Sequence, residues 1–288
     1  MDPLPIVALT TGRVRIHEAM HRGRGIGPMR RARILRQGPM GDPLPIHAWL
    51  IDHPAEGLLL VDAGETHTAA DLPFAAFDVA REDELDHQLR AAGHAPDEVA
   101  RVILTHVHGD HVDGLPHVPA ARVHASAREI ALIATPSARL TRRLTKQPLP
   151  DPFPPLEPLA LDGPAVGTFP ASTPLTADGR VIAVPAPGHT PGHLAVLVVQ
   201  PDHHVLLIGD AAYDLPQLRD LDVDGVSPRA SVAKDTMKRI LRHAAGHPTI
   251  VLPSHDPDSA RRLAEGETLG WRRGRDPGSG GAPQRCVR

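Results

Sequence analysis

A histidine-rich turn between residues 105 and 111 limits how this chain can fold more than any other stretch. The turn has the form T-H-x-H-x-D-H and follows the short apolar run 101–104, which predicts a strand. His106 and His108 are two residues apart, so on an extended segment they share one face. Gly109 allows the chain to turn, so that the polar side chains after it can point back. The fold must therefore gather these side chains at a strand end.

The residue types in this turn predict a metal site. Imidazole and carboxylate groups suit zinc and similar cations, and the only cysteine, Cys286, lies near the C-terminus. Four such groups, His106, His108, Asp110 and His111, cannot all reach one tetrahedral ion without strain. Two neighbouring metals about 3.5–4 Å apart are the more natural interpretation. A surface loop that is histidine-rich by chance is the alternative, since the chain has 19 histidines in 288 residues.

The overall composition is that of a globular protein. Apolar residues make up 41% and charged residues 23% of the chain, and the net charge is -3 with a pI near 6.7. We therefore expect no nucleic-acid partner and no membrane partner. The first residues lack the pattern of a secretion signal, so a cytoplasmic location is expected. We expect a single domain over residues 1–270 and a disordered tail over 271–288.

Apolar patterning predicts a strand-rich chain with a few helices. Residues 21–43 lack periodicity and predict a loop, and the proline-rich residues 135–175 predict a long connection or a lid. Ser227 and Pro228 predict the start of a long helix, with the serine as its cap. The expected strands are 6–9, 14–16, 46–51, 58–61, 101–104, one beginning at 123, 181–184, 194–199, 205–208 and 249–252, and the expected helices are 82–92, 126–133, 228–246 and 258–265.

Further metal-ligand types stand at, or just after, other predicted strand ends. These are His189, Asp210 and His255. Strands that end at the same edge of packed sheets bring such residues together, so we expect one composite site. Asp62 also ends a predicted strand, and it is expected either to accept the free N–H of a ligand histidine or to cap a turn. His193 is expected to begin a strand and not to bind metal.

These motifs together resemble the metallo-β-lactamase superfamily, and the likeness covers roughly residues 6–265. The resemblance implies an enzyme with an α+β fold, the αββα sandwich. In that fold two mixed β-sheets face each other and helices lie on their outer faces. The motifs that carry the likeness are the T-H-x-H-x-D-H turn, Gly188-His189, Gly209-Asp210 and Ser254-His255.

The resemblance also assigns the metal ligands. It implies two divalent metal ions, with zinc preferred and iron, cobalt or manganese as alternatives. Asp210 would bridge both ions, together with a water or hydroxide. The first ion would be bound by His106, His108 and His189, and the second by Asp110, His111 and His255.

Within the superfamily the chain most resembles the N-acyl-homoserine lactonases, which act in quorum quenching. The spacings His189 to Asp210 and Asp210 to His255, 21 and 45 residues, are similar to theirs. Tyr213, the only tyrosine, stands where lactonases carry an active-site tyrosine; the alternative for it is a packing role. The run Leu50–Pro54 also looks like theirs.

One position departs from the lactonase pattern. Gly109 stands where several lactonases carry a bulky residue between the second histidine and the aspartate. The wall that holds an acyl chain would then come from Phe74, Phe77 or the 135–175 segment.

The expected reaction is hydrolytic opening of a lactone ring, with a small-molecule ester as the substrate. A hydroxide held between the two metals would attack the ester carbonyl. The Tyr213 hydroxyl would donate a hydrogen bond to the developing oxyanion. The resemblance makes Asp110 the general acid for the leaving alkoxide. The sequence is compatible with a homodimer and does not determine the oligomeric state.

Several other activities fit the same ligand pattern. A glyoxalase II-like thioester hydrolase shares the turn and the bridging aspartate, although the presence of Tyr213 disfavours this alternative. A dinuclear-zinc esterase or phosphotriesterase would use the same scaffold. A persulfide dioxygenase would hold one iron, whereas His111 and His255 favour a second metal. A metal-binding protein without catalytic activity is the last alternative.

Overall fold

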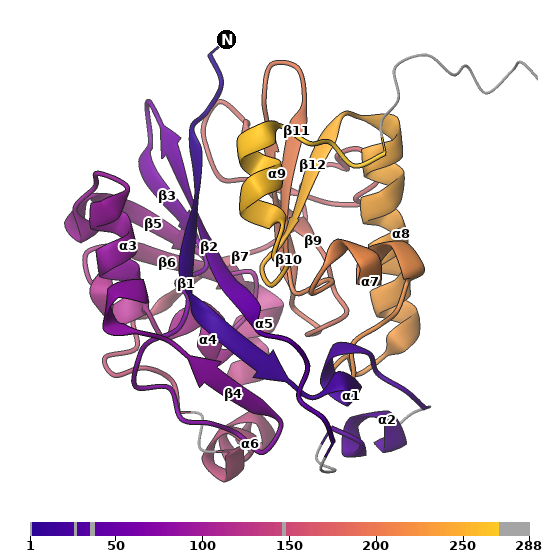
Figure 1. Ribbon diagram of the computed structural model, residues 1–288. Coiled ribbons are helices and arrows are strands. Elements are labelled where there is room, and N and C mark those ends of the chain that lie inside the picture. Colours follow the sequence, from indigo (N-terminus) through magenta and orange to yellow (C-terminus); the bar gives the residue numbers. More distant parts are fainter. Residues whose placement is uncertain (1, 26–27, 35–37, 146–147, 271–288) are drawn as a thin grey trace, which may run out of the picture.

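Two β-sheets lie face to face, and helices cover the outer side of each sheet (Figure 1). This computed structural model describes residues 2–25, 28–34, 38–145 and 148–270. The tail over 271–288, predicted to be disordered, lies outside the described residues. The arrangement confirms the predicted α+β sandwich of two mixed sheets.

The first sheet has seven strands in the order β4-β1-β2-β3-β5-β6-β7. The pairs β4-β1, β1-β2 and β2-β3 are antiparallel. The strands β3, β5, β6 and β7 run parallel to one another. The strands are β1 (Ile6–Ile16), β2 (Leu44–His53), β3 (Gly57–Val61), β4 (Ala75–Asp78), β5 (Val99–Ile103), β6 (Arg122–Ser126) and β7 (Leu156–Leu159).

The second sheet has five strands in the order β12-β11-β10-β9-β8. Only the pair of β11 and β12 is parallel, and the remaining pairs are antiparallel. The strands are β8 (Thr173–Pro174), β9 (Val181–Pro185), β10 (Leu194–Val199), β11 (His204–Gly209) and β12 (Thr249–Pro253).

The helices divide between the outer faces of the two sheets (Figure 1). α3 and α5 cover the first sheet, α7 and α8 cover the second, and α9 packs on both β12 and β1. The helices are α1 (Glu18–His21), α2 (Pro28–Ala32), α3 (Leu85–Ala91), α4 (Gly109–Val112), α5 (Ala127–Ile133), α6 (Pro136–Thr145), α7 (Leu215–Asp220), α8 (Ala230–Gly246) and α9 (Ser259–Glu265).

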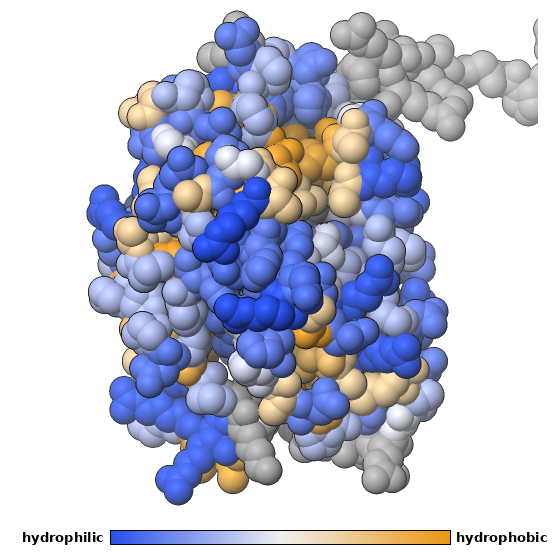
Figure 2. Space-filling model, turned by 60° about the vertical axis from the view of Figure 1, so that its left-hand side comes forward, coloured by the Kyte–Doolittle hydropathy of each residue, from blue (hydrophilic) through white to orange (hydrophobic). Residues whose placement is uncertain are grey.

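The aliphatic core follows from the alternation of side chains along each strand. In β10, Leu194 and Val196 pack between the sheets, whereas Ala195 and Leu197 pack under the helices. The strands of the second sheet are therefore apolar on both faces, as expected for a sheet that is covered on both sides. On the outside, hydrophilic residues cover most of the face shown in Figure 2, with smaller hydrophobic areas between them.

Two N-terminal expectations were wrong. β1 is one strand and not two, because a bulge between Thr10 and Arg13 lets the ladder continue; Gly12 there has a φ of 100°. The 21–43 segment was expected to be a loop, yet it includes the short helix α2.

Two later expectations were also wrong. The 135–175 segment contains α6, β7 and β8 among its described residues, so it is not one long connection without secondary structure. Leu140 and Leu144 of α6 are 57% and 74% exposed, so burial imposes no apolar period there. α8 begins at Ala230, because the Ser227 hydroxyl donates to Asp224 and does not cap the helix.

A search of the helices in the described part of the chain finds none with the length and apolar character needed to cross a membrane.

Candidate metal centre

The seven predicted ligand side chains meet at one edge of the two sheets. β5 ends just before the 106–111 turn, and His189 lies in the loop between β9 and β10. Asp210 follows the end of β11 directly, and His255 follows the end of β12 by two residues. These strand ends share one edge, so residues far apart in the sequence become neighbours.

Three imidazoles form the first group of donor atoms. Nε2 of His106 and Nε2 of His189 lie 2.9 and 3.0 Å from Nδ1 of His108. The three ring centroids are 4.5, 4.7 and 4.8 Å apart. One nitrogen of each ring therefore points at a common centre.

Asp110, His111 and His255 form the second group, whose donor atoms lie within 4.8 Å of one another. Nε2 of His255 is 3.4 Å from Oδ2 of Asp110, and Nε2 of His111 is 3.9 Å from Oδ1 of Asp110. The single turn of α4 makes this possible, because it carries the carboxylate and the imidazole of Asp110 and His111 back toward the sheet edge.

The carboxylate of Asp210 lies between the two groups. Its Oδ2 is 3.9 Å from Nε2 of His106 and 3.5 Å from Nε2 of His189. Its Oδ1 is 3.3 Å from Nε2 of His111 and 3.3 Å from Nε2 of His255. Each oxygen of one carboxylate thus faces a different set of donors.

These donors fit two divalent cations. Nitrogens bound to a tetrahedral zinc at about 2.0–2.1 Å lie about 3.4 Å apart, close to the spacings in both groups. Nε2 of His111 and Oδ1 of Asp210 are buried and have no hydrogen-bond partner among the residues that the structure describes. Buried polar atoms without a partner are rare, and a metal ligand is one of the few roles that explains them.

In four of the ligand imidazoles an oxygen lies beside the nitrogen that faces away from the donor cluster. Such contacts fix the ring orientation and the tautomer. The pairs are Asp62 Oδ2 with His111 Nδ1 (2.8 Å), Asp224 Oδ2 with His189 Nδ1 (3.2 Å), the Pro45 carbonyl with His255 Nδ1 (2.8 Å) and Thr105 Oγ1 with His106 Nδ1 (3.1 Å).

Asp62 also holds the start of the metal turn. Its Oδ1 accepts a hydrogen bond from the Thr105 amide at 2.7 Å, and its Oδ2 accepts one from the Thr105 hydroxyl at 2.9 Å. Its φ of 61° is left-handed, a conformation that aspartate tolerates better than most residues. Of the two expectations for Asp62, the geometry favours the one in which it holds a ligand histidine.

Asp224 is a buried carboxylate that the sequence analysis missed. It accepts hydrogen bonds from the Ser227 amide at 2.6 Å and the Ser227 hydroxyl at 2.9 Å. Burial alone would raise the pKa of Asp224, but His189 and these donors keep it below its ordinary value. An aspartate three residues before a serine was the one local signal, and it indicates only a turn.

Glu129 is a second buried carboxylate that the sequence analysis missed. It accepts a hydrogen bond from the Thr190 hydroxyl at 2.7 Å and one from the Val107 amide at 3.3 Å. Glu129 thereby ties the loop that carries His189 to the turn that carries the first two ligands. Burial raises the pKa of this carboxyl.

The charges of the centre are set by burial and by neighbouring ligands. Burial and the adjacent His189 lower the pKa of His108 to about 4, so this imidazole is neutral and able to bind metal. Burial opposes ionisation of Asp210, but His255 and His111 keep its pKa well below the usual range. The side chain that lies between the two donor groups is therefore a carboxylate anion.

His193 supports the centre without belonging to either donor group. Its buried Nε2 accepts a hydrogen bond from the Asp210 amide at 3.1 Å. Burial and the neighbouring His189 lower its pKa to about 3, so the ring is a neutral acceptor. It directly precedes β10, and it fixes the backbone of Asp210.

Tyr213 closes a small cavity of about 30 Å³ beside the donor groups. The ring lies 5.8 Å from that of His189 and 5.4 Å from that of His255, and the residue is 2% exposed. Its hydroxyl has no hydrogen-bond partner in the described part of the chain. Burial, with Asp224 and Asp210, raises the pKa of Tyr213 well above its ordinary value, so the hydroxyl keeps its proton.

The cavity has an apolar side formed by Val14, Ile16 and Met20. Phe74 and Phe77 pack against the cluster that contains Tyr213, but neither lines this cavity. A side chain at position 109 would face acidic groups, because a Cβ on Gly109 would lie 3.3 Å from Oδ2 of Asp113.

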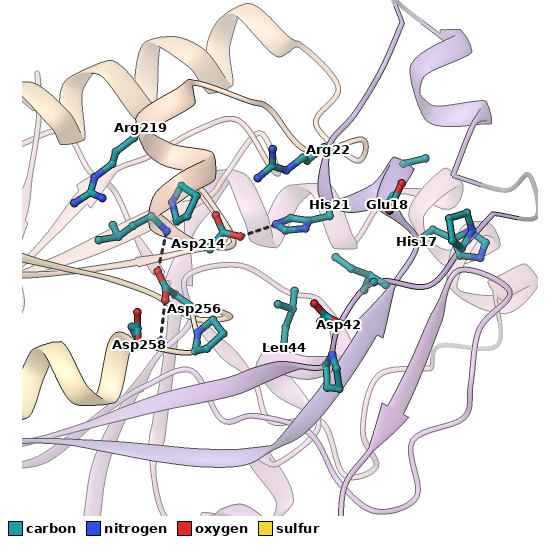
Figure 3. Close-up of a pocket in the computed structure, with 18 of the residues that line it drawn as sticks. His17, Glu18, His21, Arg22, Asp42, Leu44, Asp214, Arg219, Asp256 and Asp258 are labelled. Carbon is teal, nitrogen blue, oxygen red and sulfur yellow. Dashed lines mark hydrogen bonds and ion pairs between the residues drawn. The ribbon is translucent and has the colours of Figure 1, made fainter.

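Figure 3 shows a second, larger groove of about 1180 Å³. This groove adjoins the centre, because Ile16 lines both the groove and the small cavity. His21 points across it to Asp214, whose Oδ2 is 2.8 Å from Nε2 of the imidazole. The His21 ring also lies 5.7 Å from that of Tyr213. Charged side chains of both signs line the rest of the groove, including Glu18, Arg22, Arg24, Asp42, Arg219 and Asp258.

A family profile described as the metallo-beta-lactamase superfamily matches residues 41–255. A Mycobacterium tuberculosis protein named a probable metallo-hydrolase is 30% identical over 184 residues, which are 59% of each chain, so the match spans little more than half of that relative. The N-acyl homoserine lactonase AttM of Agrobacterium fabrum is 25% identical over 238 residues, covering 78% of this chain and 87% of AttM.

Solved structures show a similar fold at lower identity. An N-acyl homoserine lactone hydrolase with N-hexanoyl-L-homoserine at its catalytic metal centre superposes with a TM-score of 0.67 and 19% identity, covering 91% of this chain and 96% of that one. AidC, a dizinc quorum-quenching lactonase, superposes with a TM-score of 0.62 and 18% identity, covering 89% of each chain.

Proposed function

Because the chain belongs to the metallo-β-lactamase superfamily, we propose that it is a metal-dependent hydrolase that opens the ester ring of an N-acyl-homoserine lactone. The arrangement of Asp210 supports this proposal most strongly. One carboxylate with its two oxygens turned to two separate donor groups is the geometry that a two-metal site requires. The names of the lactonase relatives supply the substrate class.

His106, His108 and His189 would hold one ion, Asp110, His111 and His255 the other, and Asp210 would bridge them. We propose zinc for both sites, because the donors are imidazoles and carboxylates. When bound, the two ions would supply a nucleophile at neutral pH and polarise the ester carbonyl.

Tyr213 is proposed to stabilise the charge that develops on the carbonyl oxygen. Its hydroxyl keeps its proton and has no competing partner in the described residues, so it is free to donate to an oxyanion in the cavity. The packing of its ring against His189 and His255 holds the donor in place before substrate arrives.

Asp110 is proposed to carry the proton to the leaving alkoxide. Its side chain lines the small cavity and is 19% exposed, the most accessible of the acidic ligands. Asp110 is itself a proposed ligand, but a carboxylate that binds metal through one oxygen keeps its other oxygen to hold a proton. The second ring nitrogens of His111 and His255 already face Asp62 and the Pro45 carbonyl, so these histidines are not free to transfer a proton.

The groove beside the centre favours a thioester hydrolase of glyoxalase II type as the second candidate. Its walls carry charges of both signs, which suit a charged or zwitterionic group on the substrate better than a long acyl chain. The apolar side of the small cavity, Val14, Ile16 and Met20, favours the acyl lactone instead.

Turnover of N-hexanoyl-homoserine lactone by zinc-loaded protein tests the proposal. We expect turnover that is lost after chelation and in His108→Ala, which should also lose bound zinc. His87→Ala, at an exposed histidine of α3, is the matched control and should behave like the natural protein. Hydrolysis of a glutathione thioester but not of the lactone would favour the second candidate, and full activity of His108→Ala would refute the site.

A further inference from the structure

Three histidines converge at the other end of β11, away from the candidate metal centre. His204 begins this strand, about 17 Å from its last residue, and His243 and His247 lie at the C-terminal end of α8. We propose that these three side chains form a separate binding site for one divalent transition-metal ion, such as zinc, which would fasten α8 to the second sheet.

The spacing of the three rings is that of ligands to one ion. Nδ1 of His204 lies 3.0 Å from Nε2 of His243, and one nitrogen of each ring lies within 4.8 Å of the other two. The ring centroids are 5.2, 5.1 and 4.9 Å apart. Three imidazoles on one tetrahedral zinc at about 2.0–2.1 Å place their centroids about 5.2 Å apart.

The sequence spacing and the fold topology together place these three histidines side by side. His243 and His247 are four residues apart at the end of one helix, the spacing at which paired histidines share a face and bind zinc. The β11 strand brings His204 beside His243 and His247, since the backbone amide of His204 donates a hydrogen bond to the Pro248 carbonyl at 2.7 Å. The adjacent His203 is occupied elsewhere, 2.7 Å from the Asp202 carboxylate.

The three rings differ in burial in a way that suits an ion entering from solvent. His243 is 1% exposed, His204 is partly buried and His247 is exposed, so the site is open on one side to a water as fourth ligand. Burial lowers the pKa of His204, and burial together with His204 lowers that of His243 to about 4. Both rings are therefore neutral at pH 7, and no proton has to leave when a metal binds.

An ion at this site would bind the folded state and not the unfolded chain, so it would raise thermal stability. This consequence concerns the packing of α8 and does not depend on hydrolysis at the candidate metal centre. A hydrogen bond joins His204 and His243, and the ring of His247 lies nearly parallel to both, at interplanar angles of 18°. Ring stacking is therefore the alternative to a metal site, and zinc titration distinguishes the two.

Zinc titration of the chelator-stripped full chain against a chromophoric zinc chelator tests this proposal. We expect His247→Ala to bind one zinc fewer per chain, or to bind it at least about tenfold more weakly, and to lose the zinc-dependent rise in melting temperature. His203→Ala is the matched control and should bind zinc as the natural protein does.

The same pair of substitutions in a His108→Ala background separates the two sites. The loss caused by His247→Ala should persist there, and lactone turnover of the single variant His247→Ala should be unchanged. Equal zinc stoichiometry and affinity in His247→Ala and His203→Ala would overturn the proposed site, whatever the outcome for the lactone.

Discussion

The carboxylate of Asp224 lies 3.2 Å from Nδ1 of His189, while Nε2 of the same imidazole faces the other ligands of the candidate metal centre. The carboxylate thus selects the tautomer that leaves Nε2 free to bind metal, and it raises the basicity of the ring. Asp224 is itself fixed by two hydrogen bonds from Ser227. The ring of His189 is therefore oriented before any metal binds.

We predict that Asp224→Asn weakens zinc binding by roughly 10- to 100-fold, because a neutral amide is a poorer acceptor for the imidazole N–H. Competition with a zinc chelator measures the change. Asp222→Asn is the control, since Asp222 lies 3.5 and 3.9 Å from the guanidinium groups of Arg24 and Arg22 and makes no contact with the ligands. A zinc affinity in Asp224→Asn equal to that of the control would contradict the proposed role.

Tyr213→Phe should reduce kcat roughly 100-fold for N-hexanoyl-homoserine lactone, with zinc content unchanged. The hydroxyl is a single oxyanion donor, and removing one such donor costs about 3 kcal/mol of barrier. The phenyl ring preserves the packing against His189 and His255, so the change isolates the O–H group. Steady-state kinetics over a range of substrate concentrations separate kcat from KM. A kcat within a few-fold of the natural value would leave Tyr213 a packing residue.

The positions of the candidate ligands could be predicted from the sequence because they follow strand ends. Apolar runs mark the strands, and a polar residue after each run lies at a sheet edge. The segments that were wrong lack this signal. The helix α6 exposes Leu140 and Leu144, so no burial pattern marks it. Ser227 looks like a helix cap, but its hydroxyl is taken by a carboxylate three residues earlier.

The supporting residues could not be predicted because their partners are distant in the sequence. Asp224 lies 35 residues from His189, and Glu129 lies 61 residues from Thr190. A lone buried carboxylate carries no motif, whether it lies in a loop, as Asp224 does, or in a helix, as Glu129 does in α5. Only the packing of the folded chain shows what it contacts. Asp62 was identified because it ends a predicted strand, but only the folded structure shows that its partner is His111.

Gly188→Ala should destabilise the protein by about 1–3 kcal/mol, because an added methyl group overpacks a close approach. A Cβ at this position would lie 2.7 Å from Cα and 2.8 Å from Cβ of Ala233 in α8. Gly246→Ala is the contrasting control: a Cβ there meets no described atom within 4 Å, and alanine is the better helix former. Urea denaturation at pH 7 measures both. Equal unfolding free energies for the two variants would mean that the contact with α8 relaxes freely.

His47 should make the protein sensitive to acid. Burial, and then the nearby His255, lower its pKa to about 4, whereas the unfolded chain has a histidine pKa of about 6.5. The unfolded state therefore binds the proton more tightly, and stability is lost as the pH falls from 6.5 through 4, with no effect above that window. At pH 5 this single group accounts for a loss of about 2 kcal/mol.

His47→Gln removes the titrating ring, so between pH 7 and pH 5 its free energy of unfolding should fall by about 2 kcal/mol less than that of the natural protein. Glutamine retains a polar group for the Thr10 hydroxyl, which lies 3.1 Å from Nδ1 of His47. Because His87 is exposed, the control His87→Gln should show the natural pH dependence. Urea denaturation at pH 7, 6 and 5 compares the three proteins. If His47→Gln lost as much stability as the control, the folded and unfolded states would bind a proton at His47 equally well. That result would contradict the lowered pKa of His47 in the folded state.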